Sequence, residues 1–335
     1  MLNLSHGAAL ILAFVPAAPA LAQSPANGTP DCGAADLCVS FEAADTRFNT
    51  PPQKSPSENT YITTTTLGNL KWDVLNKANC SDPAVESCGE RMRLVSPGRD
   101  GASAIRLATL KLDNNVANSG AGMERNQIQL TPAETGAGEG VEQWWAHSLL
   151  IPGDSKLGDV HGWGMSVLSF WSPPGINFVM GVNQRGSPLR TFFRAWSSGQ
   201  GGIDSIHTQY GYRTTAGLRD IGQCLLDDLQ KDVWYDFVHR IKWSSTGQGS
   251  HSIWARKAGG PVRKVLERGP INTLYSGVNP LLKIGSYHDT LDIANRSTSA
   301  VHDRLRRGKS ADAVRMADFP VELDAPVTYC AGTGP

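Results

Sequence analysis

Short runs of alternating hydrophobic and polar residues recur along most of this 335-residue chain. They are rich in aromatic and β-branched residues, and Gly, Pro, Asn and Ser separate them. Alternation with a period of two puts successive side chains on opposite faces of a strand, so we expect an all-β sandwich or barrel of antiparallel strands. The clearest runs are Tyr61–Thr66, Ala104–Leu110, Asn126–Leu130, Trp144–Ile151, Met165–Trp171, Asn177–Val182, Arg190–Trp196, Trp234–Trp243 and Ser252–Arg256.

Helical periodicity is rare in the sequence. Leu218–Leu229 has the spacing of a short helix, and the charged stretch Val301–Ala317 has the pattern of a surface turn or helix. The chain shows no internal repeat and no interdomain linker. We therefore expect a single domain over residues 31–335, preceded by a flexible, small and polar lead-in over residues 23–30.

The N-terminus has the pattern of an export signal. The apolar run Ala8–Val15 is broken by Pro16 and Pro19, and small residues follow up to Ala22. This pattern predicts a signal peptide over residues 1–22. No later stretch reaches the roughly 18–20 apolar residues of a membrane span. We expect a secreted or periplasmic protein with no membrane partner.

Charge and cysteine content narrow the class further. The chain has 31 basic and 31 acidic residues, so no overall positive electrostatic potential favours a nucleic-acid partner. Six cysteines in an exported chain predict disulfides. The pairing that spacing suggests is one of many that six cysteines allow: Cys32 with Cys38, Cys80 with Cys88, and Cys224 with Cys330.

The most informative predicted strand is Leu281–His288. Its alternation puts Lys283, Gly285 and Tyr287 on one face, with Leu and Ile on the other. A lysine and a tyrosine that face outward are suited to chemistry on a polyanion. The glycine between them would leave room for a ligand to approach the backbone.

A second polar strand face lies in Glu124–Leu130. Arg125, Gln127 and Gln129 share one face of this predicted strand. An arginine fork flanked by amide donors is suited to bind a carboxylate, so all three are candidate substrate-binding residues. A solvated outer face explains the same pattern equally well.

Other candidates are a histidine and several tryptophans. His239 is in line with the aromatic residues of Val233–Trp243, where a histidine is more often a core residue than a catalyst; it is still a candidate catalytic base. Tryptophans offer flat surfaces that stack on sugar rings, and we expect one or two of them, with Trp171 as the candidate, to do so. The tryptophans in question are Trp144, Trp145, Trp163, Trp171 and Trp196.

Several common catalytic motifs are absent from the sequence. It contains no Gly-rich phosphate loop after a strand, no HExxH and no GxSxG. It also lacks the pair of carboxylates on one aromatic strand that a β-sandwich glycosidase would need. Acid–base hydrolysis of a neutral glycan is therefore disfavoured.

Several of these stretches together resemble the heparin lyase I-like polysaccharide lyases. That group includes glucuronan lyases and is similar in structure to the alginate lyases. The resemblance is most specific in Trp234–Trp243 and Lys283–Tyr287, and it extends from about Phe41 to Leu323. It implies a two-sheet antiparallel β-jelly roll, a concanavalin-like sandwich, and cleavage of a uronate-containing polysaccharide by β-elimination.

The resemblance also implies roles for individual residues. Tyr287 would be the catalytic acid, and also serve as a base, while Lys283 would steady negative charge. Arg125 would bind the uronate carboxylate with help from Gln127, and the two would form the facing wall of an anion-binding groove. The implied partner is an anionic polysaccharide. We expect a monomer that requires no cofactor. A structural calcium ion between loops, as in related jelly rolls, is compatible with this expectation.

Two positions depart from the family pattern. Gln127 stands where the family usually has the glutamate of an Arg-x-Glu. Ser169-Phe170-Trp171 stands where related lyases often have Gln-x-His. These departures keep open the alternative of a non-catalytic carbohydrate-binding jelly roll and, less favoured, a glycoside hydrolase.

Overall fold

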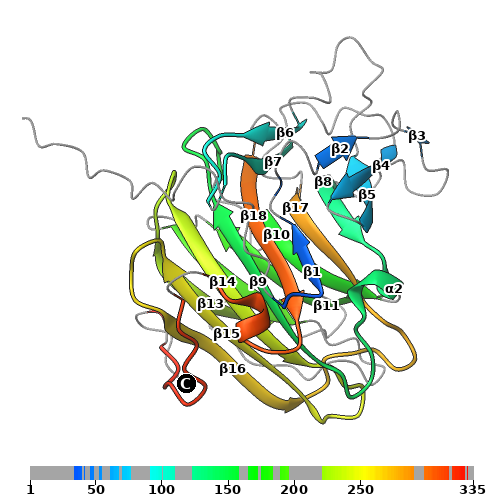
Figure 1. The fold of residues 1–335 in the computed structure, drawn as a ribbon, viewed down its shortest axis with the longest axis vertical. Coiled ribbons are helices and arrows are strands. Elements are labelled where there is room, and N and C mark those ends of the chain that lie inside the picture. The colour runs from blue at the N-terminus through cyan, green and yellow to red at the C-terminus, as the bar shows by residue number, and fades with distance from the viewer. Residues whose placement is uncertain are drawn as a thin grey trace, which may run out of the picture.

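The computed structural model is nearly all β. The described residues form two antiparallel sheets, accompanied by the short helix α2 (Pro132–Thr135) and the short 3-10 helix η2 (Asp312–Val314) (Figure 1). The prediction of an all-β, two-sheet jelly roll is confirmed. The described residues are 34–39, 41, 46–48, 53–54, 61–67, 70–76, 91–99, 101–109, 123–157, 165–172, 175–183, 189–195, 221–289, 298–316, 319–328 and 330.

The first sheet, sheet A, has the strand order β16-β15-β14-β9-β18-β7-β6, with β1 paired beside β18. Neighbours such as β9 and β18 are far apart in sequence, as the crossing connections of a jelly roll require. Its strands are β1 (Leu37–Val39), β6 (Met92–Val95), β7 (Ala104–Thr109), β9 (Glu142–Leu150), β14 (Trp234–Lys242), β15 (Gly249–Lys257), β16 (Arg263–Ile271) and β18 (Thr298–Gly308).

The second sheet, sheet B, has the order β13-β12-β11-β10-β17-β8-β5-β4-β2, with β3 paired beside β4. Strand β17, the most informative strand of the sequence, lies at its centre. Its strands are β2 (Thr46–Phe48), β3 (Gln53–Lys54), β4 (Tyr61–Leu67), β5 (Leu70–Asn76), β8 (Met123–Leu130), β10 (Met165–Ser172), β11 (Gly175–Asn183), β12 (Leu189–Ala195), β13 (Ile221–Leu229) and β17 (Leu281–Asp289).

The main core lies between the two sheets and is rich in aromatic residues. The ring of Phe170 lies 5.4 Å from Trp145, 4.8 Å from Phe178 and 5.2 Å from Trp243, measured between centroids. All four side chains are buried. Burying a large apolar side chain contributes about 1.5–3 kcal/mol, so this cluster is a main source of adhesion between the sheets. Trp145 is therefore a core residue and offers no surface to a sugar.

A second, smaller core covers the outer face of sheet A. Trp144 stacks on Trp254 with ring centroids 5.6 Å apart, and the indole of Trp254 donates to the backbone of Glu322. The chain after β18 folds back over these rings and buries them. The cluster consists of Trp144, Ala146, Val238, Trp254, Val314, Met316 and Phe319.

A buried ion cluster lies on the same outer face. Asp236 is fully buried and accepts hydrogen bonds from Arg99 at 3.0 Å, from Arg256 at 2.9 Å and from Ser148 at 2.7 Å. Burial raises the pKa of this carboxyl, but the charges of Arg99 and Arg304 outweigh burial and hold its pKa below the usual value. Asp236 is thus ionised and joins sheet A to the segment before β7.

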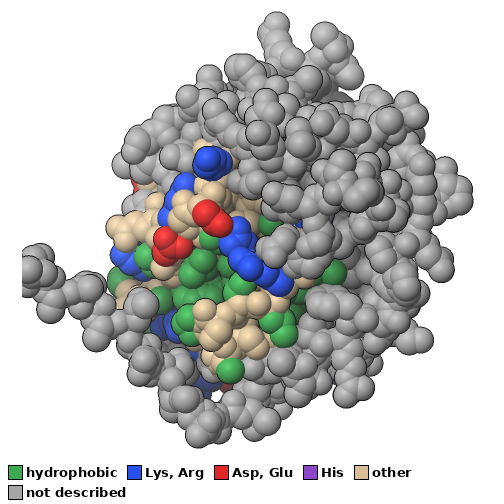
Figure 2. All heavy atoms as spheres, turned by 90° about the horizontal axis from the view of Figure 1, so that it is seen from above, with side chains coloured by type: hydrophobic (Ala, Val, Ile, Leu, Met, Phe, Trp, Pro, Cys, Tyr) green, Lys and Arg blue, Asp and Glu red, His purple; other side chains and the backbone are tan. Residues whose placement is uncertain are grey.

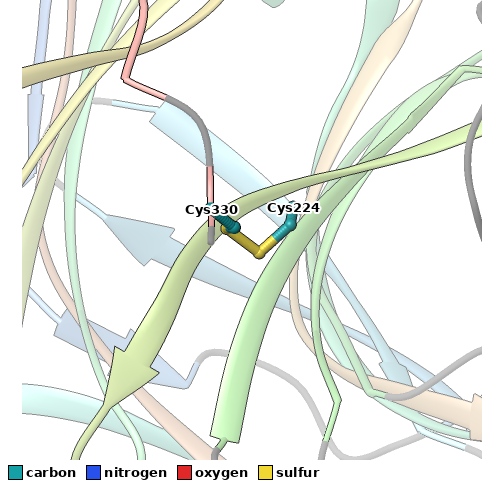
Figure 3. Close-up of a disulfide and its surroundings, with 2 residues drawn as sticks. All are labelled: Cys224 and Cys330. Atoms are coloured by element: carbon teal, nitrogen blue, oxygen red, sulfur yellow. A yellow bond between two sulfur atoms is a disulfide. The ribbon is translucent and has the colours of Figure 1, made fainter. Parts of the chain in front are cut away.

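One disulfide links the two sheets at an edge. Cys224 of β13, the edge strand of sheet B, is bonded to Cys330 in the C-terminal segment (Figure 3). That segment runs along β16, the edge strand of sheet A, where Val327 forms a bridge with Lys264. The prediction of this pair is confirmed. Cys38 is also disulfide-bonded, whereas Cys32, Cys80 and Cys88 lie outside the described residues.

Two sequence predictions of secondary structure were wrong. Residues 221–229 form strand β13, although the spacing of their leucines suggested a helix. The stretch Val301–Ala317, predicted as a charged surface turn or helix, instead begins in β18 (Thr298–Gly308), a buried central strand of sheet A, and only its later part turns and forms η2. In β18 the charged side chains are buried because partners receive them: Asp303 accepts from the Arg99 backbone at 2.6 Å.

Charges of both signs are mixed on the described part of the face that Figure 2 shows. In the view of Figure 2, basic and acidic side chains of the described residues lie next to each other around a hydrophobic centre. The described helices include none that is long and apolar enough to cross a membrane. The predicted signal peptide and lead-in lie outside the described residues.

Candidate active site

The outer face of β17 carries the two residues that the sequence singled out. Leu282 and Ile284 belong to the main core, so the alternation of the strand puts Lys283 and Tyr287 on the face that points away from sheet A. Both side chains are half-buried. The predicted shared face of Lys283 and Tyr287 is therefore present in the fold.

Strand β8 pairs with β17 directly, and the register is regular. Gln129 is opposite Lys283, and Arg125 is opposite Tyr287. The expectation that Arg125 and Gln127 form a facing wall was wrong, because their strand is the neighbour of β17 in the same sheet. Direct cross-strand partners lie within about 5 Å of each other at Cβ, which is closer than a facing wall would be.

The predicted binding residues of β8 differ in exposure. Gln129 is half-buried, whereas Gln127 is only 2% exposed. The backbone of Arg125 is described, but its side chain lies outside the described part of the chain. Sequence reasoning overlooked Asp73 of β5, whose backbone is paired with Gln129 and which thus adds an acidic residue to the same register row.

Strand β10 borders β17 on its other side. Ser169 is opposite Lys283, and Trp171 is opposite Leu281. The ammonium of Lys283 lies over the ring of Trp171, 4.7 Å from its centroid. This cation–π contact fixes the lysine against a half-buried indole and makes one continuous surface of the two side chains.

Gly285 serves the sheet itself. Its φ is 141°, and a Cβ at this position would collide with the Asn126 carbonyl oxygen and lie 2.8 Å from the Gln127 Cα. The glycine therefore allows the β8 backbone to approach closely. This packing requirement accounts for the glycine by itself, and the expectation that it admits a ligand stays a prediction.

A family model described as polysaccharide lyase matches residues 66–306, which is most of the chain and includes β8, β10 and β17. The chain belongs to the polysaccharide lyase family. It is accordingly an enzyme, and its substrate is a polysaccharide. No curated protein sequence matches the lyase.

Solved structures similar to the lyase include a glucuronan lyase and several alginate lyases. The endo-β-1,4-glucuronan lyase of the fungus Trichoderma reesei has 15% identity and a TM-score of 0.49, with 67% of this chain and 88% of that chain covered. The marine PL-14 alginate lyase from Aplysia kurodai has 8% identity and a TM-score of 0.44, with 66% and 88% covered. The alginate lyase from Klebsiella pneumoniae has 12% identity and a TM-score of 0.41, with 66% and 84% covered.

His239 does not share the face of Tyr287. It lies in β14 of sheet A, is 1% exposed, and its cross-strand partners Trp145 and Ile253 belong to the main core. Burial lowers the pKa of His239 to about 3, so the imidazole is neutral at ordinary pH. The structure thus separates this predicted base from the other predicted catalytic residues.

His239 is part of a row of four buried histidines, which we call the histidine row: His302, His147, His239 and His251, on β18, β9, β14 and β15. The ring of His239 lies 5.3 Å from that of His147 and 5.3 Å from that of His251, between centroids. Burial lowers the pKa of each of the four. Among the described residues, no group of three or more His, Cys, Asp or Glu could hold a metal ion.

Proposed function

We propose that this polysaccharide lyase is exported and cleaves a uronate-containing, anionic polysaccharide by β-elimination, with Tyr287 as the residue that transfers the proton. The observation that carries the proposal is the outer face of β17. Lys283 and Tyr287 share that face, and the register places Gln129 and Arg125 directly beside them. Cationic and amide side chains in this arrangement suit a substrate that carries a carboxylate on each sugar.

In the proposed elimination, Tyr287 both removes and returns the proton. Tyr287, as the phenolate, takes the proton from C5 of the uronate. The C4–O4 bond breaks while the C4–C5 double bond forms, and Tyr287 returns the proton to the departing O4. Arg125, whose backbone is opposite Tyr287, is assigned to the uronate carboxylate, where its charge stabilises the carbanion-like transition state.

Export is supported by the disulfide between Cys224 and Cys330. Disulfides persist in oxidising compartments, which agrees with the apolar N-terminal run and its small-residue cleavage site. The proposed elimination uses protein side chains only, and we expect the enzyme to act as a monomer without a cofactor. A structural calcium ion between loops stays a prediction.

The test is an absorbance assay on the purified protein with glucuronan, alginate and heparin. Each elimination creates an unsaturated uronate, so ultraviolet absorbance should rise with at least one of the three. The Tyr287→Phe variant should lower kcat by at least about 100-fold, because it removes the proton-transferring hydroxyl. Its KM should change little.

A matched control is Tyr275→Phe, since Tyr275 is buried outside β17. This variant should keep the wild-type kcat. Full turnover by Tyr287→Phe would overturn the assignment of Tyr287, and a folded enzyme that is silent on all uronate glycans would overturn the substrate class.

A further inference from the structure

The interior side of β17 is polar just behind Tyr287. Ser286, the residue before Tyr287, points into the sandwich and is fully buried. Its hydroxyl is hydrogen-bonded to that of Thr298 on β18 at 3.0 Å. The hydroxyl of Thr298 is in turn 2.6 Å from that of Thr109 on β7. This chain of hydroxyls crosses from sheet B to sheet A.

A second polar contact crosses the interior beside the first. Asn126 of β8 is the cross-strand partner of Ser286 and is also fully buried. Its amide nitrogen donates to the carbonyl of Ala108 on β7 at 3.1 Å and to the carbonyl of Arg91. The two strands that carry Tyr287 and Arg125 are thus both tied to sheet A at this point. We call Ser286, Asn126, Thr298 and Thr109 the polar bridge.

Polar side chains are unusual at inward positions of a sandwich, where apolar packing is favoured. Apolar contacts are non-directional, so a strand held only by them can shift slightly without a large change in energy. Hydrogen bonds require particular distances and angles. A buried bridge of short side chains therefore fixes the height and the axial position of β17 relative to sheet A.

We propose that Ser286, Asn126 and Thr298 are positioning residues, which hold Tyr287 at the place on the outer face where it reaches the substrate. The proposal rests on the proposed role of Tyr287 in proton transfer. A misplacement of about 1 Å at a reacting group can lower a rate by roughly 100-fold, so an anchor on the residue next to Tyr287 has direct consequences for kcat.

Thr298 is the best position for a test because its hydroxyl contacts the hydroxyls of both Ser286 and Thr109. Thr298→Val has nearly the same shape but no hydroxyl, whereas Thr298→Ser keeps the hydroxyl. We expect Thr298→Val to lower kcat by roughly 10- to 100-fold with KM within about twofold of wild type. Thr298→Ser should restore kcat to within about threefold of wild type.

Ser148→Ala is the matched control for loss of a buried hydrogen bond. Ser148 is fully buried and donates to Asp236 on the outer face of sheet A, away from β17. It should lose stability comparable to that of Thr298→Val and keep kcat. If both variants lower kcat alike, or if Thr298→Val keeps full kcat, the bridge is structural only and the proposal is overturned.

A double variant tests whether the bridge acts through Tyr287. In the Tyr287→Phe background, Thr298→Val should cause no further loss of the residual rate, because the residue that the bridge positions has already lost its hydroxyl. A further tenfold loss would overturn the proposal.

Failure of the proposed function would look different. If the wild type has no lyase activity, or if Tyr287→Phe is fully active, the role of Tyr287 has failed. The anchoring itself is then decided by amide hydrogen exchange of residues 281–289. Thr298→Val should raise exchange in this segment and Ser148→Ala should not; equal exchange in both would overturn the anchoring as well.

Discussion

Lys283 and Tyr287 are four residues apart on one strand, a separation of roughly 13 Å in an extended chain. Neighbouring sugars in a polysaccharide are several ångströms apart, so under the proposed function the two side chains would meet different sugars. The residues near Tyr287 in the register are Arg125 and Ser166, whereas those near Lys283 are Gln129 and Ser169. The proposed function therefore assigns proton transfer at Tyr287 and substrate binding at Lys283 as separate tasks.

This separation predicts a split in the kinetic constants. Lys283→Met should raise KM for a uronate polysaccharide by about 5- to 10-fold with a smaller change in kcat, because it removes a charge that contacts a sugar beside the reacting one. Trp171→Leu should act in the same direction, since the ammonium of Lys283 lies 4.7 Å from the Trp171 ring centroid and loses its support. Initial rates at varied substrate concentration measure both effects.

Lys242→Met is the matched control for the loss of one lysine, because Lys242 is half-buried at the end of β14 in sheet A. Its KM should equal that of the wild type. A fall in kcat of Lys283→Met as large as that of Tyr287→Phe would contradict the division of tasks.

At the scale of elements, alternation identified β17 and its two faces but failed for β18. In β17 the inward positions Leu282 and Ile284 are apolar, which is the pattern that sequence reasoning detects. In β18 Asp303, Arg304 and Arg306 are buried, and their partners come from residues far apart in sequence, such as Arg99 and Asp236. Sequence reasoning assigns such charged residues to the surface, because a single sequence does not show which segments will cover them.

The sequence contains a signal for the polar bridge that alternation alone does not interpret. Ser286 and Asn126 occupy inward positions of strands that were correctly predicted, and a polar residue at such a position needs a partner. The register that makes them partners in one bridge depends on tertiary pairing, which no local pattern contains. The histidine row was missed for the same reason, since its members come from four strands.

The histidine row predicts loss of stability in acid. The pKa of His239 is lowered to about 3 and that of His302 to about 4, from about 6.5 in the unfolded chain. Between these values the unfolded chain binds more protons, so stability is fully present above about pH 6.5 and falls as pH decreases toward 4. Each histidine contributes a slope of up to about 1.4 kcal/mol per pH unit.

His147→Leu should make this pH dependence less steep. Neither ring nitrogen of His147 has a hydrogen-bond partner among the described residues, so the variant removes a titrating group without breaking a hydrogen bond. The midpoint of thermal unfolding, measured by circular dichroism from pH 7.5 to pH 4.5, should fall less for this variant than for the wild type. Identical slopes would contradict the role assigned to the row.

At the scale of the whole molecule, different interactions join the two sheets in the interior and at the edge of the sandwich. Aromatic packing and the polar bridge join the sheets inside, while the disulfide joins them at the β13–β16 edge. The pairing of Cys224 with Cys330 was predicted from the spacing of the other cysteines. Its structural meaning, a link from the edge strand of sheet B to the C-terminal segment that pairs with the edge strand of sheet A, required the fold.

Removing this disulfide should destabilise the protein without altering the site chemistry. The two cysteines are 106 residues apart, and closing a loop of that length limits the unfolded chain by about 4 to 5 kcal/mol in the chain-entropy account. The double variant Cys224→Ser/Cys330→Ser should therefore lower Tm by at least about 5 °C. Its kcat at about 25 °C should match the wild type, because Tyr287 lies at the centre of sheet B and Cys224 lies on its edge strand. Calorimetry measures Tm, and the double variant avoids reductant, which would also act on the disulfide of Cys38. An unchanged Tm would show that the C-terminal segment is held at the edge by packing and by the bridge between Val327 and Lys264 alone.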